Sequence, residues 1–570
     1  MHSRHAGRRL WLDAALIAAI TAAIAFLSGA QRWTGFNSPD SEFYASLALF
    51  GDEVTSRSEP AYTWTRLGYI APVRSLVTTF DPWVGFAIWR TFLILLIVGS
   101  IFVLVRLRST RSLAVIVAAF TGLNTVVLSF VGNTYLTGTV IAAVLLLVAL
   151  GAWRALGAPH WAWLPAIMSG LVAGWLVMIN PYGLLLGLTM WIGLRTVALV
   201  TDGPGRWRML ARDAVLAAAG FLFAFATFLI AGLAIFKGRN WFDTYLTWNS
   251  QLDYSSFIGD GTTWQRDIAL LVPVVAVIVA VISLVVTRYS RAGIAAVVVS
   301  ATSIVFTVVY ILLVPGPWLE APTYVAKLWP GALAGLALAM GAMWGQRRLG
   351  WLGWLAAAGF LPIVLWSGRW DRDLSGVEGL LIAGVMVGMV IVAAWSLRNP
   401  RAWLAGLLVV VSVGTLAVGA QLLQNGRGLV GTYGQFPFRA AFVDFNTEML
   451  MRSKVAAQEF VLANTARGEK VMLWTDTDRL TAGIAGMQLW GWYNNVPETA
   501  ELSPDAAKLL AEQRPSAIVM YAPQQEQIDT FYASLPPWSL PSTPVCTTVP
   551  FLGIGSPEAH ICVTHVQWLQ

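Results

Sequence analysis

The chain has 570 residues, of which 57% are hydrophobic and only 12% charged, and its formal net charge is +7. Soluble domains contain about 25% charged residues, so this composition and the mean hydropathy of +0.65 exclude an ordinary soluble protein and indicate a membrane protein. No nucleic-acid partner is needed to explain the positive charge, because arginines in the short loops between apolar segments account for it.

Apolar runs that are long enough to cross a bilayer recur from the N-terminus onward. A transmembrane helix needs roughly 20 mostly apolar residues, and the sequence predicts a polytopic α-helical protein with about thirteen such spans. They lie near residues 12–29, 85–105, 113–131, 137–152, 162–179, 183–199, 214–236, 267–287, 293–314, 328–344, 351–366, 377–397 and 403–423. The first run is too long for a typical signal peptide, so we expect a retained helix.

Basic side chains alternate between the predicted connections. The N-terminus and every second loop after it carry arginines, whereas most acids lie in the intervening loops. These arginines are Arg4, Arg8, Arg9, Arg106, Arg108, Arg111, Arg154, Arg206, Arg208, Arg212, Arg288, Arg291, Arg347, Arg348, Arg398 and Arg401. The positive-inside rule therefore predicts a multi-pass protein of the cell membrane with a cytoplasmic N-terminus and a C-terminal part outside.

The first predicted outer loop, residues 30–84, contains the acidic stretch "FNSPDSEFYASLALFGDE", Phe36 to Glu53. Phe43, Leu47 and Phe50 are spaced i, i+4, i+7, which predicts a short amphipathic helix along the membrane surface. Asp40 and Glu42 then lie at its start, close to the end of the first span. One interpretation is that Asp40 is only a helix N-cap, although capping does not require Glu42.

The segment from about 424 to 570 has the pattern of a soluble domain. Predicted helices in "EMLMRSKVAAQEFVLANT" and "SPDAAKLLAEQ" alternate with predicted strands in "KVMLWT" and "SAIVMYAP", which favours an exoplasmic α/β domain after a transmembrane domain of residues 1–423. The two cysteines of the chain, Cys546 and Cys562, both lie here. An oxidising outer compartment favours a disulfide between them, and two unpaired buried thiols are the alternative.

The acidic stretch also resembles a known family. An acidic residue directly after the first span, opening an amphipathic helix, is similar to the arrangement in the GT-C superfamily of membrane glycosyltransferases. "PDSEFYASLA" resembles the Asp-Glu-x-x-Tyr type sequence of polyprenyl-phosphate-sugar transferases, but here Ser41 separates the two acids. The long outer loops and the outer C-terminal domain fit the same resemblance, which implies a GT-C-like fold over the whole chain.

The resemblance implies transfer of a sugar from a polyprenyl-phosphate-linked donor to an extracytoplasmic glycan, lipid or protein acceptor. Arginine-, alanine- and tryptophan-rich usage suggests an actinobacterial cell-envelope enzyme, for which arabinofuranose or mannose is the expected sugar. Asp40 is then the expected general base, and Glu42 orients the acceptor or helps to bind a divalent cation. Oxygen ligands favour magnesium, manganese or calcium, whereas the five histidines do not cluster and predict no zinc site.

A lipid-phosphate leaving group needs cations at the outer face of the membrane. The residues expected to bind the donor phosphate are Arg66, Arg74, Lys237, Arg239, Lys327 and Arg369. Those expected to contact the sugar or the acceptor are Tyr44, Tyr245, Trp248, Asn249 and Tyr254. The loop 237–266 also holds Gly259-Asp260-Gly261, which indicates a mobile lid. Snorkelling cations and interfacial aromatic anchors are the alternative interpretations.

Two other function classes stay open at this point. A transporter or flippase for a lipid-linked envelope precursor would carry ionisable residues near the bilayer midplane. The predicted spans show almost no internal charge, and Asp13 and Arg195 lie near span ends, which disfavours transport. A scaffold that binds envelope glycan through its tail would leave Asp40 as a simple cap.

Overall fold

The computed structural model describes the chain in part. The described residues are 2–27, 44, 47–49, 51, 62–80, 82–122, 127–128, 131, 136–157, 163–201, 206–238, 241–243, 271–313, 329–344, 431–433, 436–438, 456–457, 459–461, 463–466, 471–475, 510–511, 514–522, 525–535, 539–553 and 556–569. The chain falls into two compact units. The helical unit comprises residues 1–31, 88–229 and 252–442, and the loop-and-tail unit comprises residues 32–87, 230–251 and 443–570.

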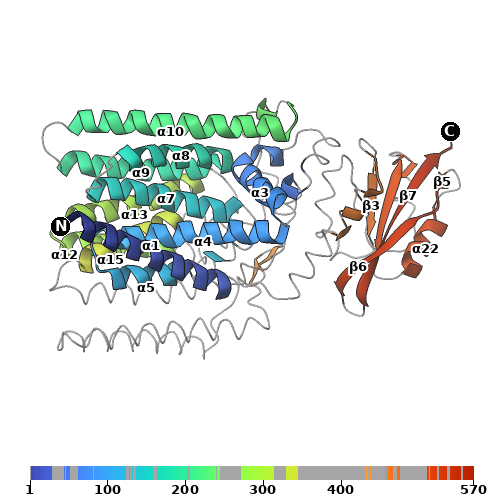
Figure 1. The fold of residues 1–570 in the computed structure, drawn as a ribbon, viewed down its shortest axis with the longest axis horizontal. Helices are drawn as coiled ribbons and strands as arrows, with labels where there is room; N and C mark the ends of the chain where they lie inside the picture. The colour runs from blue at the N-terminus through green and yellow to red at the C-terminus, as the bar shows by residue number, and fades with distance from the viewer. Residues whose placement is uncertain are drawn as a thin grey trace. The chain divides into compact units, whose positions relative to one another are not determined.

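Long apolar helices build the helical unit, and they lie side by side with roughly parallel axes (Figure 1). They are α1 (His2–Leu27), α4 (Pro82–Arg106), α5 (Arg111–Gly122), α7 (Leu136–Leu156), α8 (Trp163–Ile179), α9 (Pro181–Thr201), α10 (Arg206–Ile235), α12 (Leu271–Val286), α13 (Arg291–Leu313) and α15 (Trp329–Trp344). Each coincides with one of the first ten predicted spans. The last three predicted spans lie outside the described residues, so the count of thirteen stays a prediction.

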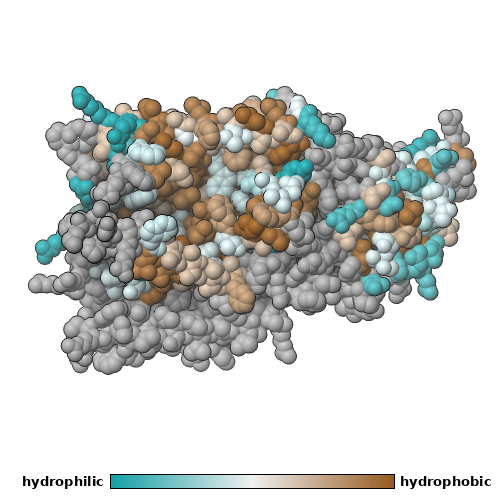
Figure 2. Space-filling model, viewed as in Figure 1, coloured by the Kyte–Doolittle hydropathy of each residue, from teal (hydrophilic) through white to brown (hydrophobic). Residues whose placement is uncertain are grey.

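Length and composition support a membrane location for these helices. Among the described residues, four stretches are long and apolar enough to cross a membrane: Val84–Arg106, Leu136–Leu156, Gly183–Val200 and Trp207–Ile235. Five shorter apolar helices accompany them. Figure 2 shows hydrophobic surface along α10, with hydrophilic residues gathered at its two ends. Leu222 and Phe223 of α10 are 63% and 69% exposed, as expected of side chains that face lipid.

Small residues let the helices of this unit approach closely. Gly170 and Gly174 of α8 are four residues apart and face α10, where Gly220 lies against α8. A Cβ atom at Gly170 would overlap the carbonyl of Ala217, and one at Gly174 would lie 2.7 Å from the carbonyl oxygen of Phe221. Such small-residue contacts are typical of helix pairs in membranes, where packing replaces the hydrophobic effect as the driving force. A short hairpin of β1 (Gly431–Tyr433) and β2 (Phe436–Phe438) also belongs to this unit.

The first loop folds into helical segments within the loop-and-tail unit. They are a helical stretch at Tyr44, Leu47–Leu49 and Gly51, the short 3-10 helix η1 (Tyr62–Thr65) and the helix α3 (Leu67–Thr79). In the first stretch Tyr44, Leu47, Ala48 and Gly51 are buried, an i, i+3, i+4, i+7 stripe. Leu47 belongs to the predicted apolar face, whereas Phe43 and Phe50 lie outside the described residues.

The described part of the tail forms a mixed sheet. Its strands are β3 (Val471–Thr475), β4 (Ala517–Ala522), β5 (Ser539–Pro541), β6 (Val545–Gly553) and β7 (Ser556–Trp568). The order is β3-β4-β7-β5, with β6 also on β7; β3 and β4 run parallel, and β7 is antiparallel to its partners. The two predicted strands are β3 and β4. That the tail is a domain of its own stays a prediction.

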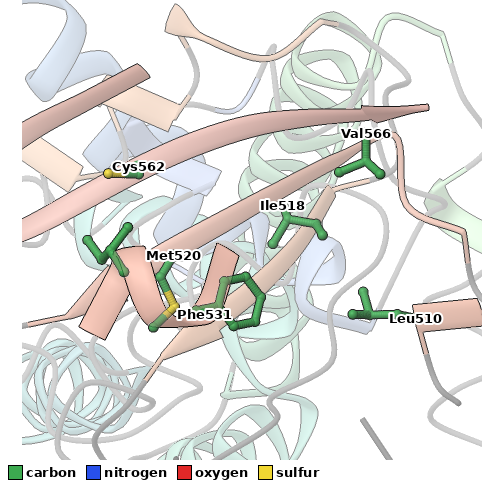
Figure 3. Close-up of a cluster of buried hydrophobic side chains, with 7 residues drawn as sticks. Leu510, Ile518, Met520, Phe531, Cys562 and Val566 are labelled. Atoms are coloured by element: carbon green, nitrogen blue, oxygen red, sulfur yellow. The ribbon is translucent and has the colours of Figure 1, made fainter. Parts of the chain in front are cut away.

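One hydrophobic cluster holds the helix α22 (Gln525–Ala533) against β4 and β7 (Figure 3). Ile518 and Met520 of β4, Ile528 and Phe531 of α22, and Cys562 of β7 are fully buried in it. Cys562 also forms a disulfide with Cys546, which lies directly opposite on β6. Tyr532 packs against the same cluster, and burial raises the pKa of its phenol well above the ordinary value, an effect that the Thr564 hydroxyl only partly offsets.

Candidate functional site

The structure describes some of the residues expected in the site. Tyr44, Arg66, Arg74 and Lys237 are described, and all four belong to the loop-and-tail unit. The other expected residues lie outside the described part: Asp40, Glu42, Arg239, Tyr245, Trp248, Asn249, Tyr254, Lys327 and Arg369. Their roles stay predictions, as does most of the lid 237–266.

Tyr44 joins the acidic stretch to α3. Its side chain is 1% exposed, and its ring lies edge-on to that of Tyr69, with the ring centroids 6.2 Å apart. Tyr69 is itself fully buried in the first turn of α3. In the sequence, Tyr44 follows Asp40 by four residues and Glu42 by two. Tyr44 therefore holds the helical stretch that follows the acidic residues in the sequence against the start of α3.

Arg66 places a positive charge at the N-terminus of α3. Its carbonyl oxygen accepts hydrogen bonds from the N–H groups of Tyr69 and Ile70, each 3.0 Å long, so its backbone opens α3. Its side chain is only 3% exposed. An arginine is rarely so buried unless acceptors or an anion match its charge. The N-terminus of α3 adds its own positive potential, so both sources of charge favour an anion at this end of the helix.

Arg74 lies two turns further along α3 and packs on the helical stretch that follows the acids. Its Nη1 donates a long hydrogen bond of 3.4 Å to the carbonyl oxygen of Ala48. The guanidinium also covers Gly51: a Cβ atom there would lie 2.7 Å from Nη1 and 3.2 Å from Cζ. The absence of a side chain at Gly51 therefore leaves the space that the Arg74 guanidinium occupies. The contact between Gly51 and Arg74 packs α3 against the first helical stretch.

An aromatic cluster joins the first loop to the end of α10, where the predicted lid begins. Trp64 of η1 stacks on Phe236 with ring centroids 4.6 Å apart, and Phe236 lies 6.2 Å from Trp241. Trp64 and Trp241 are 0% and 1% exposed. Gly232 gives them room, because a Cβ atom there would lie 2.5 Å from the Trp241 ring and 2.6 Å from Leu67. The sequence analysis assigned no role to Trp64 and Trp241, and only the fold brings them together.

Lys237 ends α10. It has a positive φ of 51°, and Gly238 follows with φ 77° and donates its N–H to the carbonyl oxygen of Leu233 at 2.9 Å. This is a left-handed helix end, which glycine adopts without strain and lysine seldom does. The side chain of Lys237 is exposed. Besides the expected phosphate role, its charge suits the negative C-terminal end of α10.

The spans hold more charge than the sequence analysis found. Arg90, within α4, is 1% exposed, and Asp213 of α10 is fully buried. Arg90 lies inside the predicted span 85–105 and was not noted there, whereas Asp213 precedes the predicted span 214–236 by one residue and belongs to α10 because this helix begins at Arg206. Arg90 could have been found in the sequence, because it is the one arginine in the predicted span 85–105. An ionisable side chain inside an apolar span costs free energy, so such a residue is a candidate for a functional site.

No carboxylate or histidine cluster for a metal occurs within the described residues: none of them forms a group of three or more His, Cys, Asp or Glu side chains that could hold an ion. The expected ligands Asp40 and Glu42 lie outside that part of the chain. They are two oxygen donors, the type that magnesium, manganese and calcium prefer.

Solved structures of membrane glycosyltransferases are similar to this chain. ArnT from Cupriavidus metallidurans, bound to undecaprenyl phosphate, matches with a TM-score of 0.48 and 13% identity over 96% of this chain and 97% of its own. The oligosaccharyltransferase AglB from Archaeoglobus fulgidus, in complex with an inhibitory peptide and a dolichol-phosphate, matches with a TM-score of 0.42 and 10% identity over 91% and 71%. The arabinosyltransferase EmbB from Mycobacterium smegmatis matches with a TM-score of 0.43 and 13% identity over 71% and 40%.

All three are GT-C glycosyltransferases, the family that the acidic stretch resembles. No family model and no curated protein sequence matches the chain. At identities of 10% to 13% and TM-scores below 0.5, this similarity assigns no role to an individual residue of the chain.

Proposed function

We propose that this membrane protein is a GT-C-type glycosyltransferase that moves a sugar from a polyprenyl-phosphate donor to an acceptor outside the cytoplasm. The proposed sugar is arabinofuranose or mannose, and the proposed acceptor is a glycan, lipid or protein of the cell envelope. One observation carries the proposal: Arg66 is buried at the positive end of α3, in the same folded segment as Tyr44. A cation for a lipid phosphate and carboxylates for an acceptor hydroxyl thus belong to one loop.

The proposed reaction uses these groups in one substitution. Asp40 accepts the proton of the acceptor hydroxyl, whose oxygen forms a bond to the anomeric carbon of the sugar. The bond between that carbon and the phosphate oxygen breaks, and its electron pair leaves on the phosphate. Arg66 and Arg74 stabilise the charge on the departing lipid phosphate, which a planar guanidinium can bind through two parallel hydrogen bonds. Glu42 orients the acceptor, and with Asp40 it would hold a divalent cation.

Substitution of Arg66 tests the proposal, because the burial of this side chain at the start of α3 is the observation that supports it. The purified wild type should transfer radiolabelled sugar from polyprenyl-phosphate mannose or polyprenyl-phosphate arabinofuranose to an envelope glycan acceptor. Arg66→Lys keeps the charge but loses the fork geometry, so the KM for the donor should rise by about 10-fold, whereas Arg66→Gln should lose more than 100-fold in kcat/KM. A donor KM unchanged in a folded Arg66→Lys enzyme would remove Arg66 from the donor site.

A transporter of a lipid-linked envelope precursor is the second candidate, and the burial of Arg90 within α4 is the observation that favours it. Reconstituted vesicles with a fluorescent polyprenyl-phosphate sugar on one side separate the two functions. Translocation without transfer to any acceptor would favour the transporter, and transfer without translocation would favour the glycosyltransferase.

A further inference from the structure

The disulfide of the tail joins an exposed cysteine to a buried one. Cys546 of β6 is exposed, whereas Cys562 of β7 is 0% exposed. The two residues lie directly opposite each other in the antiparallel register of β6 and β7, so their side chains are on the same face of the sheet. The difference in exposure therefore depends on what covers this face at each of the two strands.

The hydrophobic cluster of the tail covers this face at β7. Met520 lies opposite Cys562 on the neighbouring strand β4, and Phe531 of α22 belongs to the same cluster (Figure 3). The fully buried members of the cluster come from β4, β7, α22 and Leu510, so β6 lies at its margin. Thr548, which follows Cys546 by two residues and shares its face of the sheet, is also exposed. Cys546 thus lies on an uncovered strand, next to a covered partner.

Access to the sulfur atom decides which cysteine reacts in thiol–disulfide exchange, because a thiolate must reach the sulfur that it attacks. An oxidant in solution can approach Cys546, whereas Cys562 becomes accessible only when the tail opens locally. The strand register holds Cys562 opposite Cys546, so a reaction between these two residues is intramolecular and needs no exposure of Cys562. The two cysteines are therefore suited to different steps of one reaction.

We propose that Cys546 is the site at which the reduced tail reacts with a disulfide-bearing oxidant, and that Cys562 is the resolving thiol. The Cys546 thiolate attacks one sulfur of the oxidant, which forms a mixed disulfide and releases the other sulfur as a thiolate. The Cys562 thiolate then attacks Sγ of Cys546, and the bond to the oxidant breaks. The two protein thiols are oxidised to the disulfide, the oxidant is reduced to thiols, and these take up the two protons through solvent.

This site shares no residue with the proposed sugar transfer, so either proposal can fail without the other. The predicted location of the tail outside the cytoplasm is a compartment in which such oxidants act and disulfides persist.

The test compares two matched variants of the reduced full chain in detergent, with glutathione disulfide as the oxidant. Cys562→Ala leaves only Cys546, and Cys546→Ala leaves only Cys562. Mass spectrometry after an acid quench should show that Cys546 forms the glutathione adduct at least about 10-fold faster than Cys562, which reacts only in locally opened molecules. In urea that unfolds the tail, the two rates should agree within about 2-fold. Equal rates in the native variants, or a faster reaction of Cys562, would overturn the proposal.

The reduced wild type provides a second measurement that does not depend on how well the variants fold. Early quenching should trap glutathione on Cys546, and this adduct should disappear as the bond to Cys562 closes. A trapped adduct on Cys562 would overturn the proposal. The same experiment with oxidised thioredoxin distinguishes the two sources of the oxidant. A mixed disulfide between thioredoxin and Cys546 would support a protein oxidant, and reaction of Cys546 with glutathione disulfide alone would support a small one.

Discussion

Replacement of Gly51 by alanine should weaken the use of the lipid donor without weakening the fold. A Cβ atom at this position would lie 2.7 Å from Nη1, 3.2 Å from Cζ and 3.6 Å from Nε of Arg74. Ordinary contacts of a Cβ atom begin near 3.4 Å, so the guanidinium must move by several tenths of an ångström. The side chain of Arg74 is flexible and partly exposed, and it can make this movement without disturbing the core.

The substitution should have opposite effects on the stability of the fold and on binding of the donor phosphate. Alanine in place of glycine within a helix stabilises by roughly 0.5–1 kcal/mol, and loss of the long 3.4 Å hydrogen bond to Ala48 offsets part of this gain. A misplaced guanidinium loses a hydrogen bond to the phosphate, worth about 1.5–3 kcal/mol for charged partners. This corresponds to a loss of about 10-fold to 100-fold in kcat/KM for the donor.

The assay compares Gly51→Ala with the wild type and with Gly99→Ala as a matched control. In the control, a Cβ atom would meet only Ile17 at an ordinary 3.7 Å. Donor kcat/KM should fall in Gly51→Ala and stay unchanged in Gly99→Ala, with Tm equal to or above that of the wild type in both. A lower Tm of Gly51→Ala with unchanged donor kcat/KM would refute the reasoning, because Arg74 would then only brace the helices.

Three further predictions concern the packing around the loop and in the tail. Gly232→Ala should cost about 1–3 kcal/mol, because a Cβ atom 2.5 Å from the Trp241 ring overpacks the aromatic cluster, and thermal unfolding measures this loss. Cys546→Ser opens a loop of 16 residues and should destabilise the tail by about 3 kcal/mol, which denaturant unfolding with and without reductant would detect. Burial raises the pKa of Tyr532 above its unfolded value, so its contribution is complete below about pH 10 and is lost as pH rises toward the folded pKa. Urea unfolding at pH 9 and pH 11 should therefore show a smaller pH effect in Tyr532→Phe than in the wild type.

Hydrophobic pattern predicted the spans well, because length and apolar composition decide them locally. The helices α7 and α13 begin and end within a few residues of the predicted spans 137–152 and 293–314. The strands β3 and β4 were predicted for the same reason. The hairpin of β6 and β7 was not, since its register depends on pairing across the sheet.

The interior of the first loop was harder to predict. The helix α3 was missed, because Pro72 lies inside it and such a residue normally ends a helix. The pairing of Tyr44 with Tyr69 and of Gly51 with Arg74 depends on how two helical segments pack, and a spacing rule within one segment carries no information on this.

The clustering of distant charges was also invisible in the sequence. Arg154 was assigned to a loop, and Arg195 to the end of a span. Asp213 lies 59 residues from Arg154 and 18 from Arg195, and only the contact between three helices brings them together. Buried ion pairs of this kind depend on tertiary packing, so composition and periodicity do not reveal them.

Replacement of Asp40 by asparagine tests the central claim most directly. The amide can still cap a helix but cannot take a proton from an acceptor hydroxyl. With polyprenyl-phosphate sugars as donors and a glycan acceptor, Asp40→Asn should lose at least about 100-fold in turnover, at the Tm of the wild type. Turnover equal to that of the wild type would make Asp40 a helix cap and would contradict the account of sugar transfer.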